Sequence, residues 1–120
     1  MEKILIVEDN HMLGVLLKDI LQEWKYKALL ARDGRNALAI LQKEKVSLVL
    51  SDVNMPGING IELLKIVRKK YEIPVIIMSS DYNMEKEALN MGAKSFLKKP
   101  FDFKKMKTEI EDVFSKITAA

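Results

Sequence analysis

The fold is indicated by LVLSD (residues 48–52), a short apolar run that stops at an acid. The same arrangement occurs in ILIVED (residues 4–9), while VIIMSS (residues 75–80) stops at two serines and FLKKP (residues 96–100) at two lysines and a proline. Apolar runs without alternation are typical of strands that are buried on both faces of a parallel sheet. Ligands of open parallel sheets bind beyond the carboxyl ends of the strands. The sequence therefore predicts that acids, hydroxyls and an ammonium group gather at one edge of a sheet.

Composition limits the classes of protein to consider. With 120 residues and no cysteine, the chain is expected to form a single domain over residues 1–120, whose core needs no disulfide or structural metal. No apolar run approaches the roughly 20 residues of a membrane span. No signal-peptide pattern opens the chain, so we expect a cytoplasmic protein that does not contact membranes. The net charge of +3 comes from dispersed lysines, which argues against nucleic-acid binding by this domain alone.

Segments with helical periodicity separate the apolar runs. We expect helices at about residues 10–24, 35–43, 59–71, 83–90 and 103–117, and a weaker edge strand at residues 28–31. The inward faces of the first and last helices are predicted to be Leu13, Leu16, Leu17, Ile20 and Leu21, and Phe103, Met106, Ile110, Val113, Phe114 and Ile117. Asn59 and Glu62 resemble a capping box at the start of the third helix, and the fourth helix is short. This alternation predicts an α/β, flavodoxin-like (βα)₅ domain, a doubly wound parallel sheet with strand order 2-1-3-4-5.

In a sheet of this order the ends of the first and third strands are neighbours, so Asp9 and Asp52 are expected to meet. Clustered carboxylates repel each other, and a hard cation such as Mg²⁺ relieves the repulsion while leaving positions for water and phosphate. Lys99 is expected to neutralise a phosphoryl oxygen, and the Ser79 hydroxyl to donate a hydrogen bond to another. A carboxylate held between a metal ion and a cation is suited to accept a phosphoryl group.

Structural roles remain open for these residues taken singly. Asp9 and Asn10 could cap the first helix, and Asp52 could be a turn residue. Ser79 could form a turn at the end of a strand, and Lys99 could be a surface lysine. The combination of these residue types at successive strand ends favours the functional interpretation over the structural one.

Five segments of the chain resemble, in order and spacing, the receiver domain of two-component response regulators, the family that includes the bacterial chemotaxis regulator. The segments are ILIVED (4–9), SDVNMPG (51–57), PVIIMSS (74–80), Gly92-Ala93 and FLKKPF (96–101). The resemblance extends from Lys3 to Lys116. No single segment is decisive, but all five together are highly specific.

The resemblance implies a role for each acid of the site. Asp52 would be the phosphoacceptor, taking its phosphoryl group from a phosphohistidine on a histidine kinase or a histidine phosphotransfer protein. Asp9, Asp52 and the backbone carbonyl of Asn54 would bind Mg²⁺ directly, and Glu8 would act through water.

It also implies roles for residues at the ends of the fourth and fifth strands. Lys99 matches the family lysine, in a peptide bond to Pro100 that is expected to be cis and to direct the ammonium inward. Ser79 matches the residue that follows the phosphoryl group on activation, and Phe96 the aromatic switch. Two features depart from the family. The stretch from Ser79 to Gly92 is shorter by about half a helical turn, and Phe96 lacks the hydroxyl of the common tyrosine, so that a switch there works by packing alone.

The expected output is binding to an unknown downstream protein or a fused output domain. The chain is not expected to be an enzyme beyond catalysing its own phosphorylation and autodephosphorylation. One alternative is a degenerate receiver that acts as a phosphorylation-independent interaction module, against which the intact set of acids, serine and lysine argues. Another is a hydrolase or flavoprotein on the same fold. Against a hydrolase, Asn54 stands where a second aspartate would be needed, and against a flavoprotein, no phosphate-binding loop follows the first strand.

Overall fold

The computed structural model describes residues 2–119, with the side-chain environments of residues 2–115, and shows one parallel sheet in the order β2-β1-β3-β4-β5. The strands are β1 (Lys3–Val7), β2 (Lys27–Ala31), β3 (Leu48–Asp52), β4 (Val75–Ser79) and β5 (Ser95–Lys98). The helices are α1 (His11–Glu23), α2 (Gly34–Lys43), α3 (Gly60–Lys70), α4 (Glu85–Asn90) and α5 (Phe103–Ala119), with a 3₁₀ turn η1 (Tyr82–Met84) before α4. The predicted fold class and strand order are therefore confirmed.

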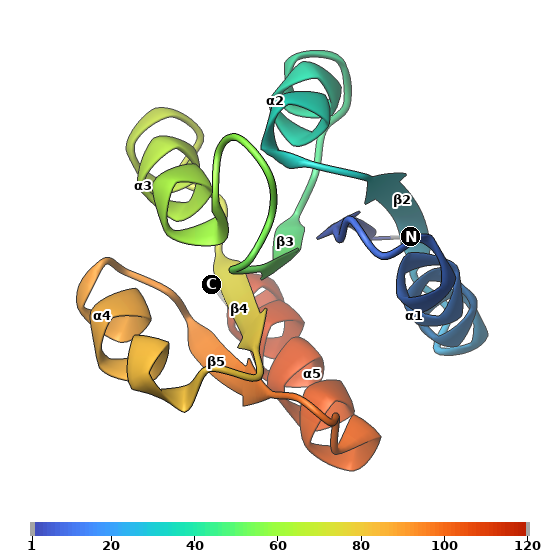
Figure 1. Cartoon of the computed structure of the whole chain (residues 1–120). Helices are drawn as coiled ribbons and strands as arrows, with labels where there is room; N and C mark the ends of the chain where they lie inside the picture. The colour runs from blue at the N-terminus through green and yellow to red at the C-terminus, as the bar shows by residue number, and fades with distance from the viewer. Residues whose placement is uncertain (1, 120) are drawn as a thin grey trace.

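Helices cover both faces of the sheet, with α1 and α5 on one side and α2, α3 and α4 on the other (Figure 1). Alternate residues of a strand face opposite layers. Accordingly, Leu5 and Val7 of β1 join the cluster under α2, α3 and α4, whereas Ile4 and Ile6 join the cluster under α1 and α5. All four are fully buried, which is why the strand reads as an unbroken apolar run.

Side chains at the start of three helices satisfy free backbone N–H groups, and they fix where the loops at the sheet edge end. Asn10 caps α1 by accepting from the Leu13 N–H at 3.0 Å, and Asp33 caps α2 in the same way. Asn59 and Glu62 form the predicted capping box of α3. Because Asn10 caps α1, the Asp9 carboxylate is not needed for that role.

Two predictions about buried helix faces are wrong. Leu16 is 48% exposed, because the face of α1 that meets the sheet is formed by Gly14, Leu17 and Leu21. Phe103 is 37% exposed at the first turn of α5, where its ring lies 5.8 Å from that of Phe101. The other described members of the α5 stripe are buried, and Ile117 lies outside the described side chains.

The fourth helix is short, as predicted, but it begins later than residue 83. Residues 82–84 form η1, and α4 spans only Glu85–Asn90. Ala88 is the residue of α4 that is buried against the sheet. Among residues 2–119, no helix combines the length and apolar character needed to cross a lipid bilayer.

Candidate functional site

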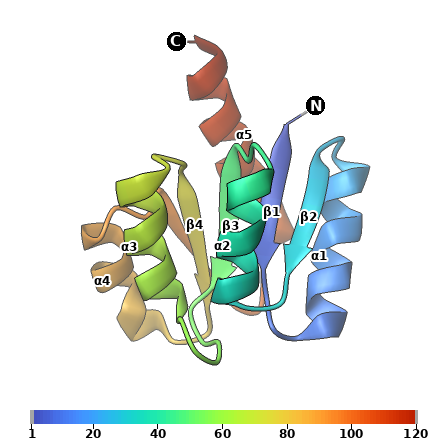
Figure 2. The same ribbon diagram turned by 90° about the horizontal axis from the view of Figure 1, so that it is seen from above.

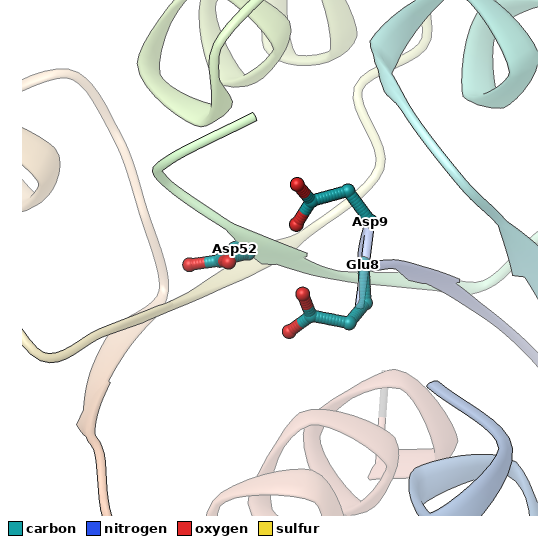
Figure 3. Close-up of side chains that lie close together, drawn as sticks. All are labelled: Glu8, Asp9 and Asp52. Atoms are coloured by element: carbon teal, nitrogen blue, oxygen red, sulfur yellow. The ribbon is translucent and has the colours of Figure 1, made fainter. Parts of the chain in front are cut away.

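Three carboxylates meet at the carboxyl edge of the sheet, the lower edge in Figure 2. Val7, the last residue of β1, pairs with Ser51 of β3, so Glu8 and Asp9 follow β1 at the level where Asp52 ends β3. The three side chains each offer an oxygen within 4.8 Å of the others. In Figure 3, the Asp9 and Glu8 carboxylates lie on the same side of Asp52, one above and the other below its level. Strand order thus brings together the two aspartates that the sequence analysis expected to meet.

The burial of the three acids differs. Glu8 and Asp52 are 2% and 7% exposed, whereas Asp9 is open to solvent. Burying an ionised carboxylate is costly unless it is paired. Glu8 is held by two donors, the backbone N–H of Asn10 at 3.1 Å and the ammonium of Lys99 at 3.0 Å.

Lys99 supplies the positive charge of the site from the segment after β5. Its Nζ lies 3.0 Å from Oε1 of Glu8 and 3.2 Å from Oδ2 of Asp52. The peptide bond between Lys99 and Pro100 is cis, as expected. The neighbouring Lys98 is exposed and places its Nζ 5.1 Å from the centre of the Tyr82 ring.

The environment of this cluster raises the pKa of both Glu8 and Lys99. Burial raises the pKa of Glu8, and the hydrogen bonds from Lys99 and from the Asn10 N–H offset only part of this rise. Burial alone lowers the pKa of Lys99, but the hydrogen bond to Glu8 and the charge of Asp52 outweigh it and raise this pKa above 10.5. Lys99 is therefore a cation at neutral pH.

Ser79 lies on the other side of Asp52 from the acid pair. Met78 of β4 pairs with Asp52, and Ser79 is the next residue. The Ser79 side chain is fully buried, and its hydroxyl oxygen accepts a hydrogen bond from the Asp81 N–H at 2.9 Å. Ser79 therefore connects the strand end beside Asp52 to the turn that leads into η1.

The loop from β3 to α3 forms the outer wall of the site. Asn54 lines an open depression together with Asp9 and other residues of this loop, namely Met55, Pro56, Gly57 and Asn59. The depression leaves room for water and a phosphate group beside the carboxylates. Asn54 thus lies on the same side of the site as Asp9.

Gly60 is a residue of the site that the sequence analysis missed. A Cβ at this position would collide with the carbonyl oxygen of Asp52 and lie 2.7 Å from the Cα of Val53. The Gly60 N–H donates to the Val53 carbonyl at 2.9 Å, so the loop folds back on the end of β3 only where no side chain intervenes. The available signal was a glycine directly after a helix-capping asparagine, which the capping pattern alone did not explain.

Phe96 is already in the core. Its side chain is 4% exposed and belongs to the same cluster as Ala88 of α4. The sequence analysis expected a packing switch at this position. The structure shows the ring buried, so any conformational switch at Phe96 would begin from a buried ring.

The donor set fits a hard divalent cation. Glu8, Asp9 and Asp52 offer oxygen atoms within one small cluster, and Mg²⁺ in proteins is bound through one or two carboxylates while keeping water and phosphate ligands. The open depression next to Asp9 leaves space for these water and phosphate ligands. No histidine or cysteine takes part in this described cluster, so the ligand chemistry does not favour a softer metal.

Comparison with known proteins agrees with the fold. The family model of the response regulator receiver domain matches residues 4–111. Sporulation initiation phosphotransferase F of Bacillus subtilis is 37% identical over 113 residues, which are 92% of this chain and 91% of that protein. Other curated relatives are longer, and the chain spans 16% of one and 55% of another.

Solved structures show the same likeness. The receiver domain of the Francisella response regulator 1452 superimposes with a TM-score of 0.91 at 28% identity, covering 98% of this chain and 99% of that one. The response regulator TrrA of Thermotoga maritima, in complex with Mg²⁺-BeF, superimposes with a TM-score of 0.88 at 30% identity, covering 94% of this chain and 99% of that one. The match spans most of the chain in sequence and in structure, and the chain belongs to the response regulator receiver domain family.

Proposed function

We propose that Asp52 accepts a phosphoryl group, in a Mg²⁺-dependent reaction in the cytoplasm, from a phosphohistidine on a histidine kinase or a histidine phosphotransfer protein. The observation that carries the proposal is the place of Asp52 at the end of the central strand β3. Glu8 and Asp9 flank it on the β1 side, and Ser79 on the β4 side. The Lys99 ammonium contacts its carboxylate at 3.2 Å.

The metal ion would be held by Asp9, Asp52 and the backbone carbonyl of Asn54, with Glu8 acting through water. When bound, it supplies positive charge that neutralises the equatorial oxygens of the phosphoryl group. Lys99 pairs with one of these oxygens, and the Ser79 hydroxyl donates to another.

In the transfer step a carboxylate oxygen of Asp52 attacks phosphorus in line with the leaving imidazole. The P–N bond of the phosphohistidine breaks, an O–P bond to Asp52 forms, and the imidazole leaves with a proton. The protein supplies alignment and charge neutralisation, which is most of what phosphoryl transfer requires. Water later attacks the phosphorus, so that inorganic phosphate leaves and the Asp52 carboxylate returns.

The output of this domain is altered binding to a downstream protein or a fused output domain. The domain is not expected to turn over a metabolite, because the phosphoryl group passes to its own Asp52 side chain and from there to water. Sporulation initiation phosphotransferase F, which is similar over nearly its whole length, supports a role for this chain in phosphoryl transfer.

Intact mass spectrometry tests the proposal. The chain, incubated with acetyl phosphate or phosphoramidate and Mg²⁺, is expected to gain one phosphoryl mass. Asp52→Asn should gain none, and Asp19→Asn, which changes an exposed aspartate of α1, should label like the parent. Equal labelling of Asp52→Asn contradicts the assignment of the acceptor. A parent chain that never labels favours the phosphorylation-independent interaction module instead.

A further inference from the structure

Tyr82 joins the segment after β4 to the segment after β5. Its hydroxyl donates to the backbone carbonyl of Lys99 at 2.9 Å, and the Nζ of Lys98 lies 5.1 Å from the centre of its ring. The contact spans 17 positions of sequence. Tyr82 is 50% exposed, so its ring adds little to the core, and the contacts at its polar end are its distinctive feature.

The carbonyl that Tyr82 binds belongs to the residue whose ammonium enters the site. The Lys99 backbone is held twice, because its N–H donates at 3.0 Å to the carbonyl of Ser79, the last residue of β4, and its carbonyl accepts from Tyr82 of η1. Its side chain contacts Glu8 and Asp52. A movement of Tyr82 therefore acts on the backbone that carries the catalytic ammonium.

Tyr82 also depends on Ser79. The Ser79 hydroxyl oxygen accepts from the Asp81 N–H, and the Asp81 carboxylate in turn accepts from the Asn83 N–H at 3.1 Å, which caps η1. Tyr82 lies between these two bonded positions. Ser79, the turn, Tyr82 and Lys99 thus form one continuous chain of hydrogen bonds and covalent links.

Phe96 has no hydroxyl with which to tie β5 to this turn, and its ring is already buried. The hydrogen bond from the Tyr82 hydroxyl to the Lys99 carbonyl links the same two segments, with the donor on the turn and the acceptor just after β5. A hydroxyl group therefore does link the turn after β4 to the end of β5 in this chain, but it belongs to Tyr82 and not to residue 96.

We propose that Tyr82 is a positioning residue that holds the unphosphorylated arrangement of the η1–α4 segment and is released when Ser79 turns toward the phosphoryl group. This rests on the proposed function of Asp52 and names the regulation of that same site. As the hydroxyl of Ser79 moves toward the phosphoryl oxygens, the Asp81 N–H loses its acceptor, the turn loosens, and Tyr82 leaves the Lys99 carbonyl. The bond to Lys99 exists in the resting form, so it opposes activation.

The test compares Tyr82→Phe with Tyr71→Phe. Tyr71, at the end of α3, also has a lysine over its ring, with the Nζ of Lys70 5.5 Å from the ring centre, so it is a matched control away from the site. The affinity for beryllofluoride with Mg²⁺, a mimic of the phosphoryl group, is measured by titration of amide NMR signals. One hydrogen bond fewer in the resting form is expected to raise the apparent affinity of Tyr82→Phe about two- to tenfold.

A second readout comes from the free protein. Amide signals of residues 82–90 in Tyr82→Phe are expected to shift part of the way toward their beryllofluoride-bound positions, while those of Tyr71→Phe stay at the parental positions. Tyr82 binds the backbone carbonyl of Lys99 and not the ammonium that enters the site, so a purely structural role would change the thermal midpoint without raising this affinity.

Parental or weaker beryllofluoride affinity in Tyr82→Phe overturns the role of Tyr82, and so does an equal gain in Tyr71→Phe. Failure of the proposed function gives a different result. In that case beryllofluoride does not bind the parent, or it binds Asp52→Asn as well as the parent, and the proposal for Tyr82 falls with it.

Discussion

The Lys99 ammonium lies 3.0 Å from Oε1 of Glu8, although the two residues are 91 positions apart in the sequence. Their strands are not neighbours, since β3 and β4 lie between β1 and β5. Three strand spacings amount to about 14 Å, so the two long side chains must reach toward each other over the end of β3. They meet beside Asp52, which Lys99 also contacts. The site is therefore an ion cluster that ties both halves of the sheet together.

Lys99→Met is expected to destabilise the metal-free protein. It leaves the Glu8 carboxylate, which is 2% exposed, without its charged partner, and an unsatisfied buried group of this kind costs about 1–3 kcal/mol. Urea unfolding in EDTA at pH 7 measures the loss. Lys98→Met, which changes the exposed neighbour, is the control and should stay within about 0.5 kcal/mol of the parent. Equal losses in the two variants would show that Lys99 does not stabilise Glu8.

Mg²⁺ is expected to raise the free energy of unfolding of the parent. A ligand that binds only the folded state adds about 2.7 kcal/mol at a concentration of 100 times its dissociation constant. Asp9→Ala should lose this gain, because it removes the solvent-open carboxylate of the cluster. Asp19→Ala, in the middle of α1, should keep it. Thermal unfolding with Mg²⁺ and with EDTA checks both, and an undiminished gain in Asp9→Ala would place the metal elsewhere.

The fluorescence of Trp24 is expected to change little when Mg²⁺ binds. Trp24 follows α1 at its far end, roughly 20 Å along the helix axis from Asn10, and the Nζ of Lys107 lies 5.7 Å from the centre of its ring. The double variant Trp24→Phe/Met12→Trp is a positive control, because it places the single tryptophan at position 12. Met12 lies at the start of α1 and is 82% exposed. That variant should respond to Mg²⁺. A saturable quench in the parent that Asp9→Ala abolishes would disprove this expectation.

Ser79→Ala is expected to accept phosphate but to lose most of the conformational response. The substitution removes both the donor for the phosphoryl group and the acceptor for the Asp81 N–H. Amide NMR shifts of residues 84–91 and 104–111, with and without beryllofluoride, measure the response. Ser80→Ala changes an exposed neighbouring serine and should respond like the parent. If Ser79→Ala responds as strongly as Ser80→Ala, the response does not pass through residue 79.

Much of the fold follows from local patterns. The apolar runs predict the strands because a strand buried on both faces has no polar side, and the order of strands and helices allows few topologies. The capping box of Asn59 and Glu62 was also predictable, because all its partners lie within four residues of one another. The acids at the strand ends were found because the chain leaves a parallel sheet always at the same edge.

Other features were decided only by contacts between distant segments. Leu16 and Phe103 fit the helical periodicity but are exposed, because the orientation of a helix on the sheet determines which of its apolar residues are covered. Gly60 is essential to the loop only because α3 begins against the end of β3.

The same holds inside the site. Sequence by itself determined which residues stand at the strand ends, since that depends on local hydrophobicity and turn chemistry. Only the tertiary structure decided that Lys99 pairs with Glu8 as well as Asp52, and that Tyr82 binds the Lys99 carbonyl. These contacts depend on side-chain reach across strands and on the path of the short η1–α4 segment, and no periodicity along the chain encodes either of them.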